Sequence, residues 1–529
     1  METNPINKSG SHLPAWDIAD LPEPEPLSWR NWKSFVGPGV VMMGIQIGGG
    51  EWLFGPQVTA RYGGGLMWIA TVAIVLQVFY NLECGRYALY CGEPVLTGFM
   101  RTAPGARFWF GVILLMNAGA LIPGLSTHGA AIIAAIILNR PPGEEDRRLV
   151  LILAHVCLIG VAAPILVGGK VYNMLQAVMT IKVLFVLGFC LTVGVLFVSV
   201  EHWWNVFSGF VNFAGVPVAD GRGGETVVNA AAYYRERGVW PTISLANIAV
   251  LGAFAGYAGG GGLANSTYSN FVRDKGWGMG RRVGAIASAI GGKNITLSHV
   301  GKIFSITDDN MRRWHGWRRY VLADQAFIWT AGCFMGMALP ALLSLEFARY
   351  STLQGTASKL DWAQALITAD GLRHAPRFGA ILAKALWGTA LVAGLAVMLP
   401  SQMSIVDDFS RRWTDAIWTA NARVRRTFRP DQVKWIYYAI LTAYLLWSLL
   451  FVNLFSTPRL MTIVIANLNN VAIGSTSFLL IWINHRLLPR ALRPGPVATI
   501  GVLCCGTFYL GLALLVFVAQ VIPLIARSP

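Results

Sequence analysis

The chain has 529 residues, of which 55% are hydrophobic and 13% are charged. Soluble domains carry about 25% charged residues, so the polar surface that would cover several globular domains is missing. This composition excludes a typical soluble enzyme and indicates a multi-pass membrane protein. Lysine and arginine number 42 against 26 acidic residues, a formal net charge of +16. In a membrane protein this surplus sets topology through basic loops, and we expect no nucleic-acid binding.

Eleven apolar segments are long enough to cross about 30 Å of hydrocarbon as helices. They lie near residues 37–60, 66–92, 106–138, 149–168, 172–200, 241–270, 318–346, 379–405, 433–455, 458–487 and 497–524. The first 35 residues lack the apolar run of a secretion signal. We therefore expect an N-terminal tail at 1–35 and a single transmembrane domain at 36–525.

The basic residues predict how the chain is oriented. The loops near 271–317 and 406–432 are rich in lysine and arginine, and both lie on the side of the N-terminus if the eleven segments alternate in direction. Cytoplasmic loops of membrane proteins are enriched in these residues. We expect a protein of the cell membrane with a cytoplasmic N-terminus and an external C-terminus.

Two of the predicted spans contain runs of consecutive glycines. The runs are Gly48, Gly49 and Gly50 in the first span, directly before Glu51, and Gly259, Gly260, Gly261 and Gly262 in the sixth. Each glycine costs a helix about 1 kcal/mol relative to alanine, and close helix packing would space small residues four apart instead. Interrupted backbone at membrane depth lines a cavity or is buried in protein. The runs therefore predict two broken helices whose free backbone groups bind a substrate.

The two glycine runs stand five spans apart. Interruptions at matching places in two five-helix halves are typical of inverted-repeat transporters, which bind their cargo near the middle of the membrane. The two halves would cover about 37–200 and 241–487, and an extra helix would follow at about 497–524.

The first span resembles that of the Nramp metal-ion transporters. Members of that family have Gly-Pro-Gly, then eight residues, then Asp-Pro-Gly-Asn, whose Asp and Asn coordinate a divalent metal. Here Gly37-Pro38-Gly39 is followed after eight residues by Gly48-Gly49-Gly50-Glu51. The family's Asp falls on Gly48 and its Asn on Glu51, and Gly260 to Ala264 replace the Met-Pro-His element of its sixth span.

The resemblance implies an all-α membrane protein with a LeuT-like 5+5 inverted repeat, one extra helix, and spans one and six unwound. It also implies secondary transport of a divalent metal ion, coupled to protons by symport. Glu51 is then the expected metal ligand, assisted by the backbone of both glycine runs and by the amide oxygen of Gln402 in span eight. Such oxygen ligands suit Mg²⁺, Ca²⁺ or Mn²⁺.

Glu51 has three open roles, because its carboxylate could hold the metal, carry a proton or bind N–H groups across the interruption. Glu83 in span two and His155 in span four form a candidate proton path. Lys182 in span five either joins Glu83 or extends to the membrane surface.

Further polar residues within the spans also allow structural explanations. Asp324 either forms an ion pair with the basic cluster at 312–319 or has a role in transport, and we favour the ion pair. Asp407 and Asp408, followed by Arg411 and Arg412, are expected at the cytoplasmic end of span eight. Asn467, Asn469 and Asn470 either face the permeation path or cross-link helices.

Two other functions are compatible with the same scaffold. One is transport of another small solute, since the glycines leave space for it, and the other is a sensor or receptor that does not transport. The sequence has no G-x-x-x-x-G-K-[ST] nucleotide loop and no H-E-x-x-H or G-x-S-x-G element. We expect a monomer without enzymatic activity or cofactor, whose partners are its small solute or metal ion and membrane lipid.

Overall fold

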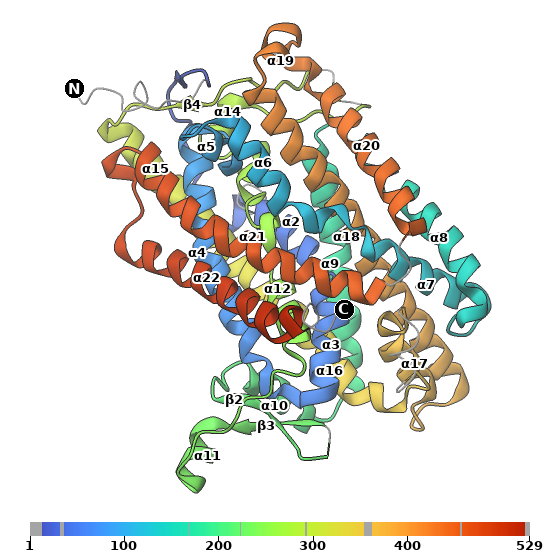
Figure 1. The fold of residues 1–529 in the computed structure, drawn as a ribbon. Coiled ribbons are helices and arrows are strands. Elements are labelled where there is room, and N and C mark those ends of the chain that lie inside the picture. Colours follow the sequence, from blue (N-terminus) through green and yellow to red (C-terminus); the bar gives the residue numbers. More distant parts are fainter. Residues whose placement is uncertain are drawn as a thin grey trace.

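The computed structural model describes residues 13–31, 36–167, 169–222, 224–290, 292, 294–353, 362–454 and 458–523. Of the predicted tail at 1–35, residues 1–12 and 32–35 lie outside this part, as does residue 524 at the end of the predicted extra helix. The described chain forms a bundle of tilted helices (Figure 1).

Most of the long helices follow the apolar segments of the sequence, and shorter or more polar helices lie between them. Those of the first half are α2 (Pro38–Gln46), α3 (Gly55–Tyr62), α4 (Trp68–Cys91), α5 (Val95–Met100), α6 (Ala106–Met116), α7 (Gly124–Leu138), α8 (Arg147–Gly160), α9 (Val171–Phe197) and α10 (Val200–Gly209). Those of the second half are α11 (Ala230–Arg237), α12 (Ile248–Tyr257), α13 (Tyr268–Lys275), α14 (Gly280–Val283), α15 (Asp308–Ala323), α16 (Thr330–Phe347), α17 (Ile367–His374), α18 (Ala380–Ala420), α19 (Ala422–Thr427), α20 (Val433–Leu454), α21 (Pro458–Leu487) and α22 (Pro496–Val516).

Among the described residues, nine helical segments are long and apolar enough to cross a membrane. They correspond to predicted spans two to five and seven to eleven. The regions of predicted spans one and six contain shorter helices, because each is interrupted near its centre. The chain is therefore a multi-pass membrane protein.

The interruptions coincide with the glycine runs. After α2 ends at Gln46, Ile47 leaves the helical conformation, and a π-helical turn at Gly50–Phe54 leads into α3. After α12, Gly259, Gly261 and Gly262 have φ angles of 91°, 66° and 59°. Glycine adopts this left-handed region without the steric cost that other residues incur, so the helix stops there and α13 begins only at Tyr268.

The predicted third span, at 106–138, consists of two helices. α6 ends at Met116, a 3₁₀ turn covers Ala118–Leu121, and α7 begins at Gly124. Ile122 is extended, with φ −105° and ψ 109°, as expected for a residue that precedes a proline, here Pro123. A single helix over the whole segment was therefore the wrong expectation.

The helix that contains the predicted eighth span, α18, continues beyond residue 405 to Ala420. The four charged residues expected at the membrane surface lie inside the helix and are buried. Arg411 and Arg412 pair with the aspartates four residues earlier, Asp407 and Asp408. Mutual pairing at this spacing lets the helix continue through the charged segment.

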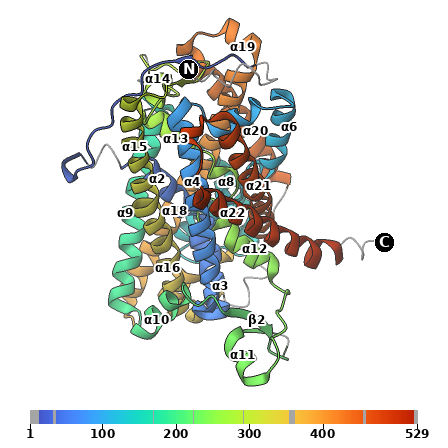
Figure 2. The same ribbon diagram turned by 90° about the vertical axis from the view of Figure 1, so that its left-hand side faces the viewer.

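Short strands lie at the two ends of the bundle. β2 (Gly215–Ala219) and β3 (Glu225–Asn229) form an antiparallel hairpin next to α10 and α11 at one end. β1 (Asp17–Ile18) pairs in parallel with β4 (Lys302–Ile303) at the opposite end, near α14 and α19. Figure 2, after a quarter turn, shows β2 and α11 at one end and α14 and α19 at the opposite end. The two loops that were predicted on the side of the N-terminus thus share one end of the molecule.

Candidate functional site

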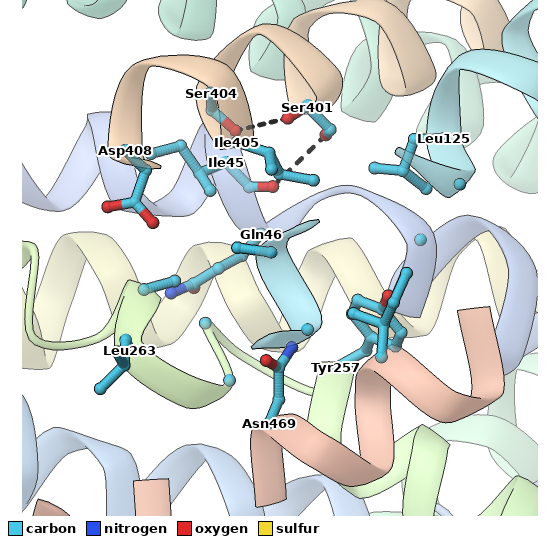
Figure 3. Close-up of a pocket in the computed structure, with 18 of the residues that line it drawn as sticks. Ile45, Gln46, Leu125, Tyr257, Leu263, Ser401, Ser404, Ile405, Asp408 and Asn469 are labelled. Atoms are coloured by element: carbon cyan, nitrogen blue, oxygen red, sulfur yellow. Dashed lines mark hydrogen bonds between the residues drawn. The ribbon is translucent and has the colours of Figure 1, made fainter. Parts of the chain in front are cut away.

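A cavity of about 90 Å³ lies where the two interrupted helices meet. The end of α2, the turn after α12, and parts of α7, α18 and α21 surround it (Figure 3). Its wall includes the backbone of Gly49 and of Gly259–Gly261. Four of the eight predicted residues of the two interruptions therefore line one space. Such a volume holds a few water molecules or one small solute.

Three amide side chains from separate parts of the chain line this cavity: Gln46, Asn117 and Asn469. Asn117 Oδ1 accepts a hydrogen bond of 2.6 Å from Arg412 Nη1, and its Nδ2 has no partner in the described structure. Gln46 Oε1 accepts from the Cys333 thiol at 2.8 Å, and its Nε2 likewise has no partner among the described residues. The cavity wall thus presents buried amide donors.

The charged side chains on the cavity wall neutralise each other. Arg412 Nε donates to Asp408 Oδ1 at 3.0 Å, and the Thr267 hydroxyl donates to the same carboxylate. Among the described lining residues these are the two formally charged groups. The lining therefore has no net formal charge.

This pair borders a larger buried network between α13 and α18. Arg411 is fully buried and bonds both Asp407 and Asp274. Arg273 joins Asp274 to Asp415, with 2.6 Å between its Nη1 and Asp415 Oδ1. Buried charges are stable only when paired in this way, so the network fixes the second half of the interrupted sixth segment against α18.

Gln77 of α4 holds the backbone of the second interruption. Its Oε1 accepts from Gly260 N at 2.8 Å, and its Nε2 donates to Ala258 O at 2.7 Å. Asn265 also donates to Gln77 Oε1, at 3.0 Å. Gln77 was not among the predicted site residues. A polar residue within an apolar span was the available signal.

Glu51 lies beside the cavity but does not line it. The side chain is fully buried, and its Oε2 accepts a hydrogen bond from Gly48 N, three residues earlier, at 3.2 Å. The carboxylate thus satisfies a backbone N–H three residues earlier, as the glutamate of a capping box does. Its Oε1 has no hydrogen-bond partner in the described structure. Of the three open roles, the bond across the interruption is the one visible in this geometry, and the metal and proton roles stay predictions.

Lys182 is buried and binds the neighbouring helix α18. Its Nζ donates to Ser401 Oγ at 2.6 Å and to Val397 O at 3.1 Å. Ser401 Oγ is in turn 3.4 Å from Ile45 O, in the last turn of α2. Lys182 therefore neither pairs with Glu83 nor extends to the surface, and it supports the end of α2 through Ser401.

The other predicted site residues are not part of the cavity lining. Gln402 is buried in α18 next to Ser401, which does line the cavity. Glu83 pairs with Arg86 at 2.7 Å and accepts from Asn484. The Nε2 atom of His155 lies 2.9 Å from Nδ2 of Asn453. Gly48, Gly50 and Gly262 are next to lining residues without being part of the wall.

The remaining polar residues within the spans divide between binding and structural positions. Asn469 lines the cavity, whereas Asn467 and Asn470 donate to the carbonyls of Ala249 and Gly252 and so cross-link α21 to α12. Asp324 accepts from Gly39 N at 2.9 Å and from the Tyr268 hydroxyl at 3.0 Å. It joins the start of α2 to α13, so the expected ion pair with the cluster at 312–319 was wrong.

The described residues contain no group of three or more histidine, cysteine, aspartate and glutamate side chains placed to hold a metal ion. The bundle with two interrupted helices around a small central cavity is the architecture of a LeuT-like membrane transporter. No protein-family model matches the chain, and no curated protein matches it in sequence.

Solved structures match the fold over almost the whole chain. The manganese transporter of Eremococcus coleocola, in complex with an aromatic bis-isothiourea compound, matches with a TM-score of 0.58 and 12% identity, over 98% of this chain and 93% of that chain. A histidine-to-alanine mutant of the same transporter matches with a TM-score of 0.60 and 12% identity, over 97% and 93%. MhsT in complex with L-phenylalanine gives a TM-score of 0.47 and 14% identity, over 94% and 100%. The predicted likeness to the Nramp transporters is thus confirmed at the level of the fold.

Proposed function

We propose that the protein is a secondary transporter that binds a small solute in the central cavity and exposes it alternately to the two sides of the membrane. The position of the cavity carries this proposal, because backbone from both interrupted helices lines it. Interrupted helices at a shared site are the recurring binding arrangement of inverted-repeat transporters. The match in fold to a manganese transporter over nearly the full length supports the same function.

We also propose the membrane topology that the sequence predicts. The protein would have eleven spans, with repeats at about 37–200 and 241–487 and the extra helix last. The N-terminus would be cytoplasmic and the C-terminus external. The shared location of the N-terminal segment, β4 and α19 at one end of the bundle supports this arrangement (Figure 1).

A divalent metal cation is the first candidate cargo, moved in symport with protons. The resemblance of the first span and the fold support it. Within the site, the unpartnered Glu51 Oε1 supports it, because a buried carboxylate oxygen without a partner among the described residues is a ready ligand for a cation. Glu51 would have to turn from Gly48 toward the cavity when the metal binds.

A small organic solute is the second candidate. The lining supports it, since its two formal charges neutralise each other and its other polar groups are amides, hydroxyls and backbone. A sensor that binds a solute without moving it would use the same cavity.

Uptake into proteoliposomes tests the proposal. Wild-type protein is assayed with Mn²⁺, Mg²⁺ and Ca²⁺, and in parallel with small organic solutes, while an internal dye follows pH. Glu51→Gln should abolish metal uptake if the carboxylate is a ligand. Metal uptake that is unchanged in this variant would remove Glu51 from the site. Saturable binding with no flux of any bound solute would favour the sensor.

A further inference from the structure

We propose that the cargo is a small organic solute of zero net charge that presents a hydrogen-bond acceptor, such as the carbonyl of an amide or the hydroxyl of a polyol, to Asn117 and Gln46. The inference rests on the proposed transport function and specifies the chemistry of its binding cavity.

The orientation of the Asn117 amide is fixed by its neighbour. A guanidinium can only donate hydrogen bonds, so the group that lies 2.6 Å from Arg412 Nη1 must be the carbonyl oxygen of Asn117. The amino group is then the free end of the side chain. Among the described residues it has no partner, although the residue is only 3% exposed. Buried donors almost always have an acceptor, and here the cavity is where an acceptor can come from.

Gln46 presents a second donor to the same cavity from the end of α2. Its residue exposure is 5%, its oxygen is engaged by Cys333, and its Nε2 has no partner in the described part of the chain. Gly260 keeps this nitrogen accessible, because a Cβ at that position would lie 2.8 Å from it. Two buried amide donors from separate segments thus point to a ligand that accepts hydrogen bonds.

The charge of the wall disfavours both kinds of ion as the best-fitting ligand. Amide N–H groups cannot coordinate a metal, and the carboxylate on the wall, Asp408, is already bound by Arg412 and Thr267. An anion would either bury an uncompensated charge beside the already paired Arg412 or displace Asp408 from it, and either change leaves a buried charge unpaired. A neutral solute needs neither change.

The remaining polar groups and the size of the cavity narrow the class of solute that fits. Asn469 adds an amide on the α21 side of the cavity, and it offers both a donor and an acceptor (Figure 3). The volume of about 90 Å³ suits a small solute. The fitting class is therefore small neutral amides and polyols rather than larger metabolites.

The test compares binding and flux for one panel of solutes. Purified wild-type protein is titrated with acetamide and glycerol, and separately with acetate, Mn²⁺ and Mg²⁺, with thermal stabilisation as the binding readout. The same solutes are then followed as radiolabelled uptake into proteoliposomes. We expect saturable stabilisation by at least one neutral member and none by the ions.

Two variants test the residues. Asn117→Asp keeps an acceptor for Arg412 but replaces the free donor with an oxygen, and Gln46→Glu does the same at the second donor. Each should weaken neutral-solute binding at least about tenfold, the equivalent of one hydrogen bond. Asn421→Asp is the matched control, because Asn421 caps α19 outside the cavity and aspartate caps equally well.

The outcomes separate this inference from the transport function. If the wild type binds a neutral solute that neither cavity variant binds, and the wild type shows no flux of it, the inference is supported and transport is contradicted. Uptake of Mn²⁺ or Mg²⁺ with no neutral solute bound supports transport and overturns the inference. Neutral-solute binding that is equal in wild type, Asn117→Asp and Gln46→Glu also overturns it.

Discussion

Replacement of Arg411 by methionine is the most direct test of the buried charge network. The arginine is fully buried and bonds Asp407 of its own helix and Asp274 of α13. Methionine fills a similar volume without donors, so Arg411→Met leaves both carboxylates short of a partner in a buried environment. The expected result is a large loss of stability.

The magnitude follows from what each aspartate retains. Removing one partner of a buried ion pair costs about 3–5 kcal/mol. Asp407 keeps the Tyr437 hydroxyl at 2.5 Å, and Asp274 keeps Arg273 Nε at 2.8 Å. Because these bonds remain, we expect the free energy of unfolding to fall by an amount near the lower end of this range, about 3 kcal/mol. In the double variant Arg411→Met with Asp407→Asn, one of the two unpaired charges is removed. This variant should recover part of the lost stability.

Equilibrium unfolding of the detergent-solubilised protein, followed by tryptophan fluorescence, measures the free energies. Arg147→Met is the control, because Arg147 pairs with Glu144 at the surface, where the two side chains are 46% and 53% exposed. Exposed pairs contribute about 0.2–1 kcal/mol. If the two variants unfold within about 1 kcal/mol of each other, the network does not hold α13 to α18.

Three further changes test the cavity and its supports. Gly260→Ala should abolish uptake of whatever cargo is found while the protein still folds, because the new Cβ would lie 2.8 Å from a cavity donor; Gly111→Ala, with nothing within 4 Å, should transport normally. Gln77→Leu leaves the Ala258 carbonyl and a glycine N–H unpaired, so thermal unfolding should show a loss of about 2 kcal/mol or more, and an unchanged midpoint would contradict the bracing role. Lys182→Met should lower uptake more than it lowers cargo binding, because it removes the tie from α9 to α18 at Ser401 while Lys182 itself is not part of the cavity lining; equal losses of both would place Lys182 in the binding site itself.

The positions of the two interruptions could be predicted from the sequence. Consecutive glycines both weaken a helix and permit the positive φ angles that Gly259, Gly261 and Gly262 adopt. The convergence of the two breaks on one cavity also followed, since their spacing indicated two related halves.

The direction of Glu51 could not be predicted in the same way. It lies in a π-helical turn, Gly50–Phe54, which inserts an extra residue and so rotates the side chains relative to an α-helix. Sequence spacing alone does not reveal that rotation. The partner of Arg411 was equally hidden, because Asp274 lies 137 residues away along the chain. The i, i+4 spacing of Arg411 from Asp407 was visible in the sequence, where both residues were expected at the cytoplasmic end of span eight.

The helix α18 is long enough to reach from the cavity wall to the surface of the molecule. At 1.5 Å per residue its 41 residues span about 60 Å, roughly twice the hydrocarbon thickness. The C-terminal end of α18 is followed, after Asn421, by α19, which carries exposed arginines. The middle of α18 contributes Ser401 and Ser404 to the cavity wall. Pro400 interrupts the hydrogen bonding just before Ser401. The cavity wall thus lies in the part of α18 where a proline weakens the helix, about midway along a helix whose end leads to the basic segment α19.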